Sequence, residues 1–480
     1  MNRLYVCSRC LRSLKRKTRH FATQASPDLY DVAVIGGGPA GLSLLTALRT
    51  SKATSNLRLA LIESRDLKQA RQWRLPPDQY SNRASSLTPA SRRFLEKCGT
   101  WSQIDHSRLR SYQKMQVWDG LSDSGRISFN STTTEEAVAY MVENSNLTKA
   151  LASQLELLKP ISMFDNTMVE NIQLGPPPDP SLSALNLSSY PHVALSSKHT
   201  IAARLLVGAD GVNGPVRTFA GIPTRGWDYD RHGVVATLKL SPHKPGSDHA
   251  TAYQRFLPSG PIALLPLPNG HATLVWTTTL EQAARLKSLS SGDFLAMVNA
   301  AFRLSVIDID FMFTQTSGQL DEFQWRASVH PISDIETSGS IPQPVVSIQP
   351  GSIASFPLRL RQAATYTSDR IALIGDAAHT IHPLAGQGLN MGLSDSQALA
   401  GVIGNAIEHG ADIGNELQCL DRFNNEVWMK NNRMLGIVDK LHWLYNARNP
   451  FIVGARSLGL RAVDSLNPLK GFFMRQASGS

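Results

Sequence analysis

A glycine-rich turn near the start of the chain constrains the fold more than any other stretch of the sequence. The apolar run Asp31–Ile35 ends at Gly36, and Gly38 and Gly41 complete the spacing G-x-G-x-x-G, with Ala40 inside the motif, before a helical pattern begins. The first glycine allows a tight turn, the second lets backbone N–H groups approach a pyrophosphate, and the third lets the helix pack close to the strand. The sequence therefore predicts a strand, a turn and a helix that bind a dinucleotide.

A second apolar run supports this prediction. Arg58 is followed by four apolar residues and then by Glu63, roughly 20 residues beyond the glycines. An acidic side chain at this place accepts hydrogen bonds from both hydroxyl groups of a ribose. The glycine pattern alone is a weak signal, and the alternative is a glycine-rich turn in another kind of α/β protein. The strand and the acidic residue together favour the dinucleotide site.

Length, charge and cysteine content exclude several protein classes. The 480 residues suggest two domains, and no apolar run reaches the ~18 residues that cross a bilayer. Four cysteines are too few for a disulfide framework, and Cys7 and Cys10 lack the second pair that a zinc site needs. The net charge is +10, but residues 1–27 contain seven Lys and Arg residues and no Asp or Glu, which leaves +3 for the rest. We therefore expect no nucleic-acid partner.

Residues 1–26 have the composition of a mitochondrial presequence. They are rich in arginine, contain serine and threonine, lack acidic residues and have spaced apolar residues. A secretory signal would need a continuous hydrophobic stretch, and the remaining alternative is a basic disordered arm. We expect this segment to direct the chain to mitochondria.

The next part of the chain alternates between helix and strand patterns. The sequence predicts a helix that Thr88 caps, with Pro89 in its first turn. Arg83 stands just before this helix and reaches the cofactor phosphates only if the chain folds back. The alternative for Arg83 is a solvated charge on the surface. The other elements expected here are a helix end at Gly99, a strand over 115–119, a helix over 135–155 and a hairpin with a long surface loop over 172–194.

A third apolar run, residues 201–208, is followed by Asp210 and Gly211. If this strand lies beside the first one, Asp210 comes near the cofactor; an ordinary Asp-Gly turn is the alternative. Beyond it the sequence predicts strands over 227–280, a helix over 291–304 and a long exposed loop over 331–350. The apolar residues 255–267 suit a wall that faces an apolar ligand, or equally the core of a sheet.

A second motif begins where another apolar strand ends at Gly375 and Asp376. A turn with Pro383, Gly386 and Gly388 then opens a helix at about Leu389, whose N–H groups suit an anionic or carbonyl-rich ring, and Asp376 suits a ribityl hydroxyl. His379 and His382 suggest a metal site, but no Cys or carboxylate at ligand spacing completes it. We expect no metal, and helices from Asp395 to the end of the chain.

In this order the motifs resemble those of the single-component flavin-dependent aromatic hydroxylases. The motifs are G-x-G-x-x-G, Glu63, Arg83-Ala-Ser-Ser-Leu-Thr, Gly208-Ala-Asp-Gly and Gly375-Asp-Ala-Ala-His. More narrowly, residues 376–390 resemble the signature of the ubiquinone-biosynthesis hydroxylases, as do residues 140–144, 254–266 and 274–276. The resemblance extends from about residue 29 to the end of the chain.

The fold class implied by this resemblance and by the patterns is α/β (α+β). A Rossmann-like FAD-binding domain would be interleaved with a β-sheet substrate domain, and a helical C-terminal region would follow. The expected segments are 27–112, 136–226 and 366–420 for the FAD-binding domain, 113–135 and 227–365 for the substrate domain, and 421–480 for the C-terminal region.

The resemblance also implies which residues bind FAD. Gly36, Gly38, Ala40 and Gly41 would cradle the pyrophosphate, Arg83 would reach it, and Glu63 would bind the adenosine ribose. Asp376, beside Gly375, would contact the ribityl chain or the pyrophosphate. The loop with Pro383, Gly386, Gly388, Leu389 and Asn390 would run past the pyrimidine end of the isoalloxazine ring. Asp210 joins this set, although Gly214 stands where the family often has a serine.

A reaction and its partners are implied as well. The substrate would be a polyprenylated 4-hydroxybenzoate, hydroxylated with O2 at ring C5 through a C4a-hydroperoxyflavin, in a dry apolar site with no catalytic residue identified. Electrons would come from ferredoxin and its reductase. The chain would join other ubiquinone-biosynthesis enzymes on the matrix side of the mitochondrial inner membrane, which it would contact peripherally. The contact surface would include Trp443, Leu444, Phe451, Phe472 and Phe473, unless these form helix-packing core.

Two other functions remain as alternatives. An FAD-dependent epoxidase or reductase of prenyl or sterol lipids would keep the fold and act on a double bond, and product analysis distinguishes it. A non-catalytic flavin-fold scaffold would belong to a biosynthetic complex and would be expected to lose the Gly375–Asp376 and Gly386-x-Gly388 elements, which are present here.

Overall fold

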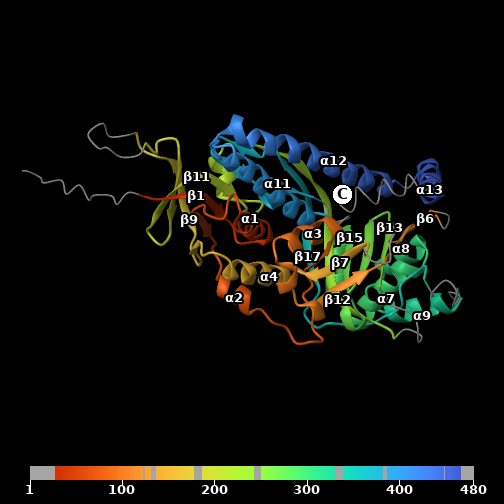
Figure 1. The fold of residues 1–480 in the computed structure, drawn as a ribbon. Helices are drawn as coiled ribbons and strands as arrows, with labels where there is room; N and C mark the ends of the chain where they lie inside the picture. The colour runs from red at the N-terminus through yellow and green to blue at the C-terminus, as the bar shows by residue number, and fades with distance from the viewer. Residues whose placement is uncertain are drawn as a thin grey trace, which may run out of the picture.

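Two large β-sheets organise the chain, and helices cover them. The computed structural model describes residues 27–122, 125–130, 137–177, 186–242, 250–329, 339–381, 386–447 and 449–465, so the predicted presequence lies outside the described residues. Figure 1 shows one sheet around β1 and β11, the other around β12 and β15, and the long helix α12 running from the first toward the second. The predicted α/β fold with interleaved sheets and a helical C-terminal region is confirmed.

The first sheet is the predicted Rossmann-like one. Five parallel strands run in the order β8-β2-β1-β11-β19, and β18, β10 and β9 extend the sheet in antiparallel pairings. The strands are β1 (Asp28–Ile35), β2 (Leu59–Ile62), β8 (Ser162–Phe164), β9 (Val169–Leu174), β10 (Pro191–Leu195), β11 (Thr200–Gly208), β18 (Thr367–Ser368) and β19 (Ile371–Leu373). Ile35 pairs with Ile62 and with Gly208, so the residues that follow these three strands meet at one edge of the sheet.

Helices flank this sheet, and a small third sheet lies beside it. The helices are α1 (Pro39–Thr50), α2 (Leu67–Gln72), α3 (Pro89–Lys97), α4 (Asn144–Leu157) and α5 (Pro215–Phe219), with 3₁₀ turns at Trp101–Gln103 and His106–Arg108. The third sheet has the order β3-β7-β4, from Ala84–Leu87, Ala139–Glu143 and Arg110–Tyr112. The Thr88 hydroxyl accepts a hydrogen bond from the Ser91 N–H, so the predicted cap of α3 is confirmed.

One predicted helix is wrong in its first half. The helix expected over 135–155 begins only at Asn144, because Ala139–Glu143 forms β7 between β3 and β4. All five residues of β7 are buried, so no alternation of polar and apolar residues marks the strand in the sequence. The hairpin of β9 and β10 is confirmed, and residues 178–185 of its predicted surface loop lie outside the described residues.

The second sheet is mostly antiparallel and takes strands from two distant parts of the chain. Its order is β20-β17-β12-β15-β14-β13-β5-β6, with β16 added to β12. The strands are β5 (Lys114–Asp119), β6 (Arg126–Asn130), β12 (Thr224–Leu240), β13 (Thr251–Leu257), β14 (Gly260–Pro266), β15 (His271–Thr279), β16 (Val345–Ile348), β17 (Ala354–Ala363) and β20 (His379–Thr380). The strands predicted over 115–119 and 227–280 are therefore confirmed.

Four helices cover one face of the second sheet. They are α6 (Leu280–Ser288), α7 (Ser291–Arg303), α8 (Val306–Thr314) and α9 (Gln319–Val329), of which only α7 is predicted. Residues from α6, α7 and α8 pack against the buried side chains of Val234, Leu264 and Trp276 in one core. The sequence carries a signal for the missed helices, because Thr279 and Ser305 accept hydrogen bonds from the N–H groups three residues later.

The exposed loop predicted over 331–350 is wrong for its second half. Residues 345–348 form β16, which pairs with β12, and the side chains of Ile341 and Val345 are buried. Val345 is further fixed by the Asn299 side chain, which accepts from its N–H and donates to its C=O. Residues 331–338 lie outside the described residues.

The C-terminal region is helical as predicted. It comprises α11 (Gly388–Glu408), a π-turn at Glu416–Leu420, α12 (Asp421–Asn446) and α13 (Pro450–Ser465). Trp443, Leu444 and Phe451 are exposed rather than helix-packing core, and Phe472 and Phe473 lie outside the described residues. None of the helices in the described ranges is long and apolar enough to span a membrane.

A buried ion pair attaches α13 to the second sheet. The Arg456 guanidinium donates to both oxygens of Asp119 at 2.6 and 2.9 Å, and it also donates to the backbone carbonyls of Leu444 and Ala447 at the end of α12. Both charged groups are fully buried. Removing one partner therefore leaves an uncompensated charge in the interior, which costs several kcal/mol.

We predict that Asp119→Asn lowers the free energy of unfolding by about 3–5 kcal/mol. Urea unfolding followed by circular dichroism measures this change. The matched control is Glu170→Gln, which removes an exposed ion pair with Lys198 and should change the free energy by less than about 0.5 kcal/mol. Equal effects of the two substitutions would contradict the role assigned to Asp119.

Candidate functional site

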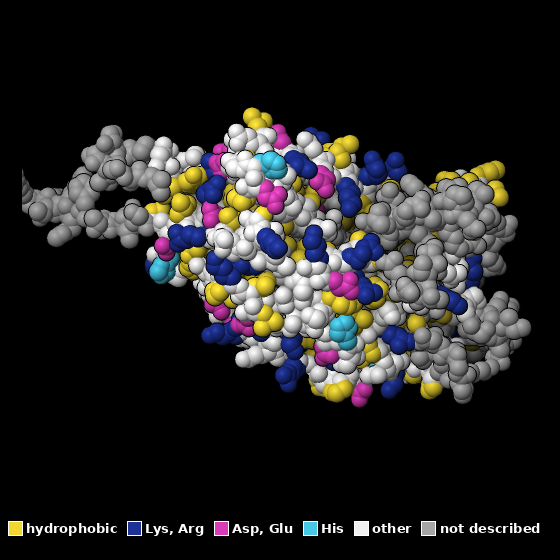
Figure 2. All heavy atoms as spheres, in the orientation of Figure 1, with side chains coloured by type: hydrophobic (Ala, Val, Ile, Leu, Met, Phe, Trp, Pro, Cys, Tyr) yellow, Lys and Arg dark blue, Asp and Glu magenta, His cyan; other side chains and the backbone are white. Residues whose placement is uncertain are grey.

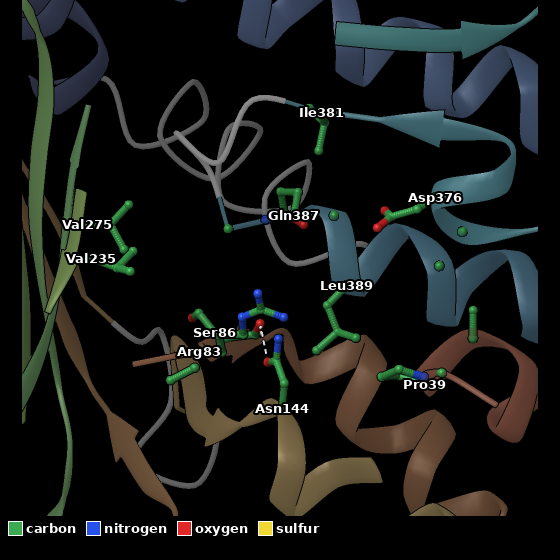
Figure 3. A pocket seen from close by; sticks show the side chains of 18 of the residues that line it. Pro39, Arg83, Ser86, Asn144, Val235, Val275, Asp376, Ile381, Gln387 and Leu389 are labelled. Atoms are coloured by element: carbon green, nitrogen blue, oxygen red, sulfur yellow. Dashed lines mark hydrogen bonds between the residues drawn. The ribbon is translucent and has the colours of Figure 1, made fainter. Parts of the chain in front are cut away.

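A large cavity lies where the two sheets meet. Its volume is about 2350 Å³, and its wall comes from the glycine-rich turn, the start of α11 and one face of the second sheet. Figure 3 shows Arg83, Gln387 and Leu389 on one side, with Val235 and Val275 across the open space. Ligand pockets usually measure about 300–1,000 Å³, so this cavity has room for more than one ligand.

The glycines form an open cradle at one end of the cavity. Gly36 has φ +112°, and a Cβ there would lie 2.2 Å from the carbonyl oxygen of Ala209, while a Cβ on Gly41 would lie 2.0 Å from that of Gly36. Gly38, by contrast, has open space beside it and precedes α1 as its N-cap, without a side-chain hydrogen bond. The first N–H groups of α1 therefore face open space, an arrangement that suits a pyrophosphate.

Glu63 is held at the edge of this cradle. The N–H of Gly37 donates to one carboxylate oxygen at 2.5 Å, and the N–H of Arg65 donates to the other at 2.8 Å. The second oxygen also accepts from the Ser64 hydroxyl at 3.2 Å, so the oxygen bonded to Gly37 is the one that keeps a lone pair for a ligand in the cavity. The structure thus brings Glu63 beside the glycines, where the sequence predicts it.

Arg83 projects into the cavity from the start of β3. Its side chain is exposed, and within the described residues it makes no ion pair. Its backbone is fixed because its carbonyl accepts the N–H of Asn144, the first residue of α4, and Figure 3 shows the guanidinium above Asn144. A free guanidinium beside uncapped helix N–H groups suits an anionic ligand.

The motif around Gly375 lies beside the glycine cradle, where a Cβ on Gly375 would lie 3.1 Å from the Cβ of Ala40. Gly375 has φ +60° and opens a 3₁₀ turn through Ala377, and Figure 3 shows the Asp376 carboxylate pointing toward the start of α11. Burial raises the pKa of Asp376, while the nearby His379 opposes this rise. Gly388 begins α11, which again has no side-chain cap, so its N–H donors are available beside Asp376.

A buried carboxylate, Asp395, supports the motif around Gly375 from behind. It accepts from the N–H of Gly375 at 2.9 Å, from Nε2 of His379 at 2.6 Å and from the amide of Asn431 at 3.0 Å. Asp395 and His379 are both almost fully buried. Burial lowers the pKa of His379, but the charge and hydrogen bond of Asp395, the charge of Asp376 and a backbone hydrogen bond together raise it, so the net shift is upward. The sequence prediction missed Asp395 as a site residue.

Asn390 does not face the cavity. Its side-chain oxygen accepts from the N–H of Thr88 and the hydroxyl of Ser91, and its amide donates to the carbonyls of Ser86 and Gly386. These bonds use its side chain to join the start of α11 to β3 and α3. The side chain therefore positions the surrounding backbone, and the predicted contact of Asn390 with the cofactor stays a prediction.

Asp210 lies at the cavity wall with its carboxylate turned toward α5. One oxygen accepts from the N–H of Val216 at 3.1 Å, and burial raises the pKa of the group. A Cβ on Gly214 would lie 1.9 Å from the Asp210 carboxyl carbon. The glycine at position 214 thus makes room for the carboxylate, which a serine there would displace.

The structure brings most of the predicted residues together. Those that line the cavity are Gly36, Gly38, Ala40, Glu63, Arg83, Asp210, Gly375, Asp376, Gly386, Gly388 and Leu389. Gly41 and Asn390 lie behind the wall, where they fix the packing of α1 and α11. Pro383 and His382 lie outside the described residues.

The far wall of the cavity is a row of side chains that crosses six strands. The residues of this row pair from strand to strand in the order Val235, Val275, Ala263, Gln254, Val117 and Ile127. All six residues line the cavity. The row is apolar except for Gln254. The sequence predicts an apolar wall within residues 255–267. In this segment the side chains of Ala263 and Leu265 face the cavity, whereas those of Ile262 and Leu264 face the core.

Comparison with known proteins agrees with this geometry. A family model described as FAD binding domain matches residues 29–417. The mitochondrial ubiquinone biosynthesis monooxygenase COQ6 of Schizosaccharomyces pombe is 37% identical over 463 residues, which are 95% of this chain and 94% of that protein. The corresponding protein of Saccharomyces cerevisiae is 39% identical over 479 residues, 96% of each.

Solved structures share the fold. The FAD-dependent monooxygenase PqsL of Pseudomonas aeruginosa, whose function is described as probable, superposes with a TM-score of 0.64 at 19% identity, over 91% of this chain and 100% of that one. The family match identifies FAD as the cofactor of this chain, and the open cradle fits the pyrophosphate of FAD.

We predict that the contribution of His379 to stability depends on pH. Its pKa is raised in the folded chain, so its stabilising effect is complete below its unfolded pKa of about 6.5 and is lost as the pH rises through the folded-state pKa. His379→Gln should therefore lower the free energy of unfolding by about 2 kcal/mol below pH ~6.5, and by less at higher pH. Urea unfolding over a pH series measures the difference.

The matched control for this prediction is His199→Gln. His199 is exposed, so its replacement should have a small effect that does not vary with pH. A difference between the parent chain and His379→Gln that stays constant or grows with rising pH would contradict the charged His379–Asp395 pair.

Proposed function

This chain belongs to the family of the mitochondrial ubiquinone biosynthesis monooxygenases named COQ6, and we propose that it hydroxylates the aromatic ring of a polyprenylated 4-hydroxybenzoate at C5. As a member of this family it is an FAD-dependent monooxygenase of ubiquinone biosynthesis. The ring position and the form of the substrate are the proposed part.

The observation that supports the substrate most strongly is the composition of the cavity. One end offers N–H donors, Glu63 and Arg83, which suit a dinucleotide, and the other is lined by the apolar row from β12 to β6. At about 2350 Å³ the cavity leaves space beside the cofactor for an aromatic ring and part of an apolar tail. A polyprenylated phenol combines these two features.

Toward FAD we propose the following roles. The turn Gly36–Gly38 and the start of α1 bind the pyrophosphate, together with Arg83, and Glu63 binds the adenosine ribose. Asp376 accepts from the ribityl chain, and the N–H groups at the start of α11, around Gly388 and Leu389, approach the isoalloxazine ring. These roles are supported by the common cavity wall on which the residues lie.

When bound, FAD supplies the redox chemistry: it takes two electrons from a donor and passes them to O2, so that one oxygen atom enters the substrate and the other leaves as water. The chain contributes the environment. The apolar row excludes water from the substrate ring, and the start of α11 and Asp376 fix the opposite wall. A phenol ring is electron-rich beside its hydroxyl group, so orientation rather than a catalytic base is what the protein must provide.

The electron donor and the cellular setting are part of the proposal. We propose ferredoxin and its reductase as donors, other ubiquinone-biosynthesis enzymes as partners, and the matrix side of the inner membrane as location. The names of the relatives support mitochondria, and the family resemblance supports the remainder.

We place the membrane contact on the outer face of α12 and α13. Met429, Arg433, Lys440 and Trp443 recur at helical spacing on α12 and are exposed, and Figure 2 shows hydrophobic side chains gathered where α13 lies. From Met429 onward the sequence has eight Lys and Arg residues against two acidic ones. Exposed aromatic and basic side chains on a helix suit an anionic lipid surface.

This surface lies over the cavity. Phe451 is 87% exposed and Trp443 is 70% exposed, whereas Leu441 and Tyr445 on α12 and Ala455 on α13 line the cavity from inside. A substrate with a polyprenyl tail would therefore pass from the bilayer into the cavity between the same two helices.

The function is tested with purified chain, FAD, ferredoxin and its reductase, a prenylated 4-hydroxybenzoate and isotopically labelled O2. We expect a product with one labelled hydroxyl group at C5, and no product when NADPH replaces the ferredoxin system. Mass spectrometry and NMR identify the product. A labelled epoxide would favour the epoxidase alternative, and bound flavin without turnover would favour the scaffold.

The membrane surface is tested by brominated lipids, which quench tryptophan fluorescence only when the indole enters the bilayer. Vesicles of brominated phosphatidylcholine with phosphatidylglycerol should quench the parent chain, and Trp443→Phe should abolish this quenching while vesicle binding is retained. Because residues 1–26 contain no tryptophan, the basic N-terminal segment does not contribute to the signal.

The matched control is Trp325→Phe, which changes another exposed tryptophan, 59% exposed on α9, and should leave the quenching intact. Added salt should weaken binding because the basic residues face an anionic surface. Quenching that persists in Trp443→Phe, or no quenching in the parent chain, would contradict this placement.

A further inference from the structure

Gln254 is a polar residue in the apolar wall of the cavity. It lies in the middle of β13, paired with Ala263 on one side and Val117 on the other. Its side chain lines the cavity and is only 5% exposed. The rest of its cross-strand row consists of Val235, Val275, Ala263, Val117 and Ile127.

The amide of Gln254 has no hydrogen-bond partner among the described residues, unlike several other polar side chains that line the cavity. The hydroxyl of Ser86 bonds to that of Tyr112 at 2.7 Å, and the hydroxyl of Thr148 donates to the carbonyl of Asn144. The next residue, Arg255, points to the other face of the sheet, where it donates to two backbone carbonyls of α7 and its cap. The hydroxyl groups of Ser86, Tyr112 and Thr148 are therefore engaged within the protein.

The Gln254 amide faces the cavity, and a ligand that fills this end of the cavity would cover it, which costs free energy unless the ligand offers a hydrogen-bond partner. The amide is therefore available for a ligand. A glutamine can donate through its NH₂ group and accept through its carbonyl oxygen, so it suits an oxygen substituent that is a hydroxyl or a carboxylate.

We propose that Gln254 is a specificity-determining residue that hydrogen-bonds an oxygen substituent of the substrate ring and so fixes the orientation of the ring in the cavity. This inference rests on the proposed function, because it takes the ligand of the apolar end to be an oxygenated aromatic ring. Because its neighbours Val117 and Ala263 are apolar, Gln254 is the one residue of this row whose side chain can hydrogen-bond the ring. An incorrectly turned ring would leave the amide unpaired, which gives selectivity.

The test compares binding of three probes to the FAD-loaded chain without reductant. They are a prenylated 4-hydroxybenzoate, the same compound without its hydroxyl group, and the same compound without its carboxylate. Gln254→Met keeps the volume and removes the amide. It should weaken binding of the probe that carries the anchored oxygen by about tenfold and leave binding of the probe that lacks it unchanged.

The pattern across probes identifies the oxygen. If the hydroxyl is anchored, the probe without hydroxyl is insensitive to Gln254→Met; if the carboxylate is anchored, the probe without carboxylate is insensitive. Gln254→Glu adds a second readout, because a carboxylate at this position should repel a carboxylate-bearing probe more than a phenol. The matched control is Leu265→Met, a volume-conserving change on the same wall, which should affect all probes alike and weakly.

Perturbation of the flavin absorption spectrum measures binding, and the thermal midpoint of each variant verifies folding. Equal weakening for all three probes, or no weakening, would overturn the role of Gln254. Failure of the parent chain to bind any probe, with FAD in place, would overturn the proposed function and this inference with it.

Discussion

The buried carboxylate of Asp395 is the contact on which the geometry of the site depends most. It joins α11, which carries it, to the segment from Gly375 to His379 and, through Asn431, to the long helix α12. Because the group is fully buried, each of these donors is needed to offset its desolvation. The turn that carries Asp376 is thereby fixed to the helix whose far end, at Trp443, lies over the cavity.

The cavity follows from how two different sheets share one chain. The parallel sheet ends its strands at a single edge, so the glycine turn and Glu63 meet there, and the second sheet turns one face toward that edge. Its other face is covered by α6, α7 and α8, which leaves the cavity face free for ligands. Polar recognition and apolar recognition thus lie on separate walls of one space, as a reaction between a dinucleotide cofactor and an apolar substrate requires.

Local chemistry made part of this structure predictable from sequence. The turn at Gly36 and Gly41 is specified by close backbone approaches that only glycine permits, and the cap at Thr88 by its own hydroxyl. The remainder depends on register and on contacts between distant residues. The row from Val235 to Ile127 forms only when six strands pair in the correct register. The hydrogen bond between Asp395 and Asn431 forms only when α11 and α12 pack together. The sequence prediction misses β7 because all of its residues are buried, and it misses β16 because that strand has only four residues.

The most direct test of the account is an experimental structure of the chain with FAD and a prenylated 4-hydroxybenzoate bound together. The account predicts the adenosine at Glu63, the pyrophosphate at Gly36–Gly38 and the aromatic ring against the row that contains Gln254, with its tail directed toward α12 and α13. A substrate ring bound outside this cavity, or an FAD molecule that occupies the apolar row, would contradict it.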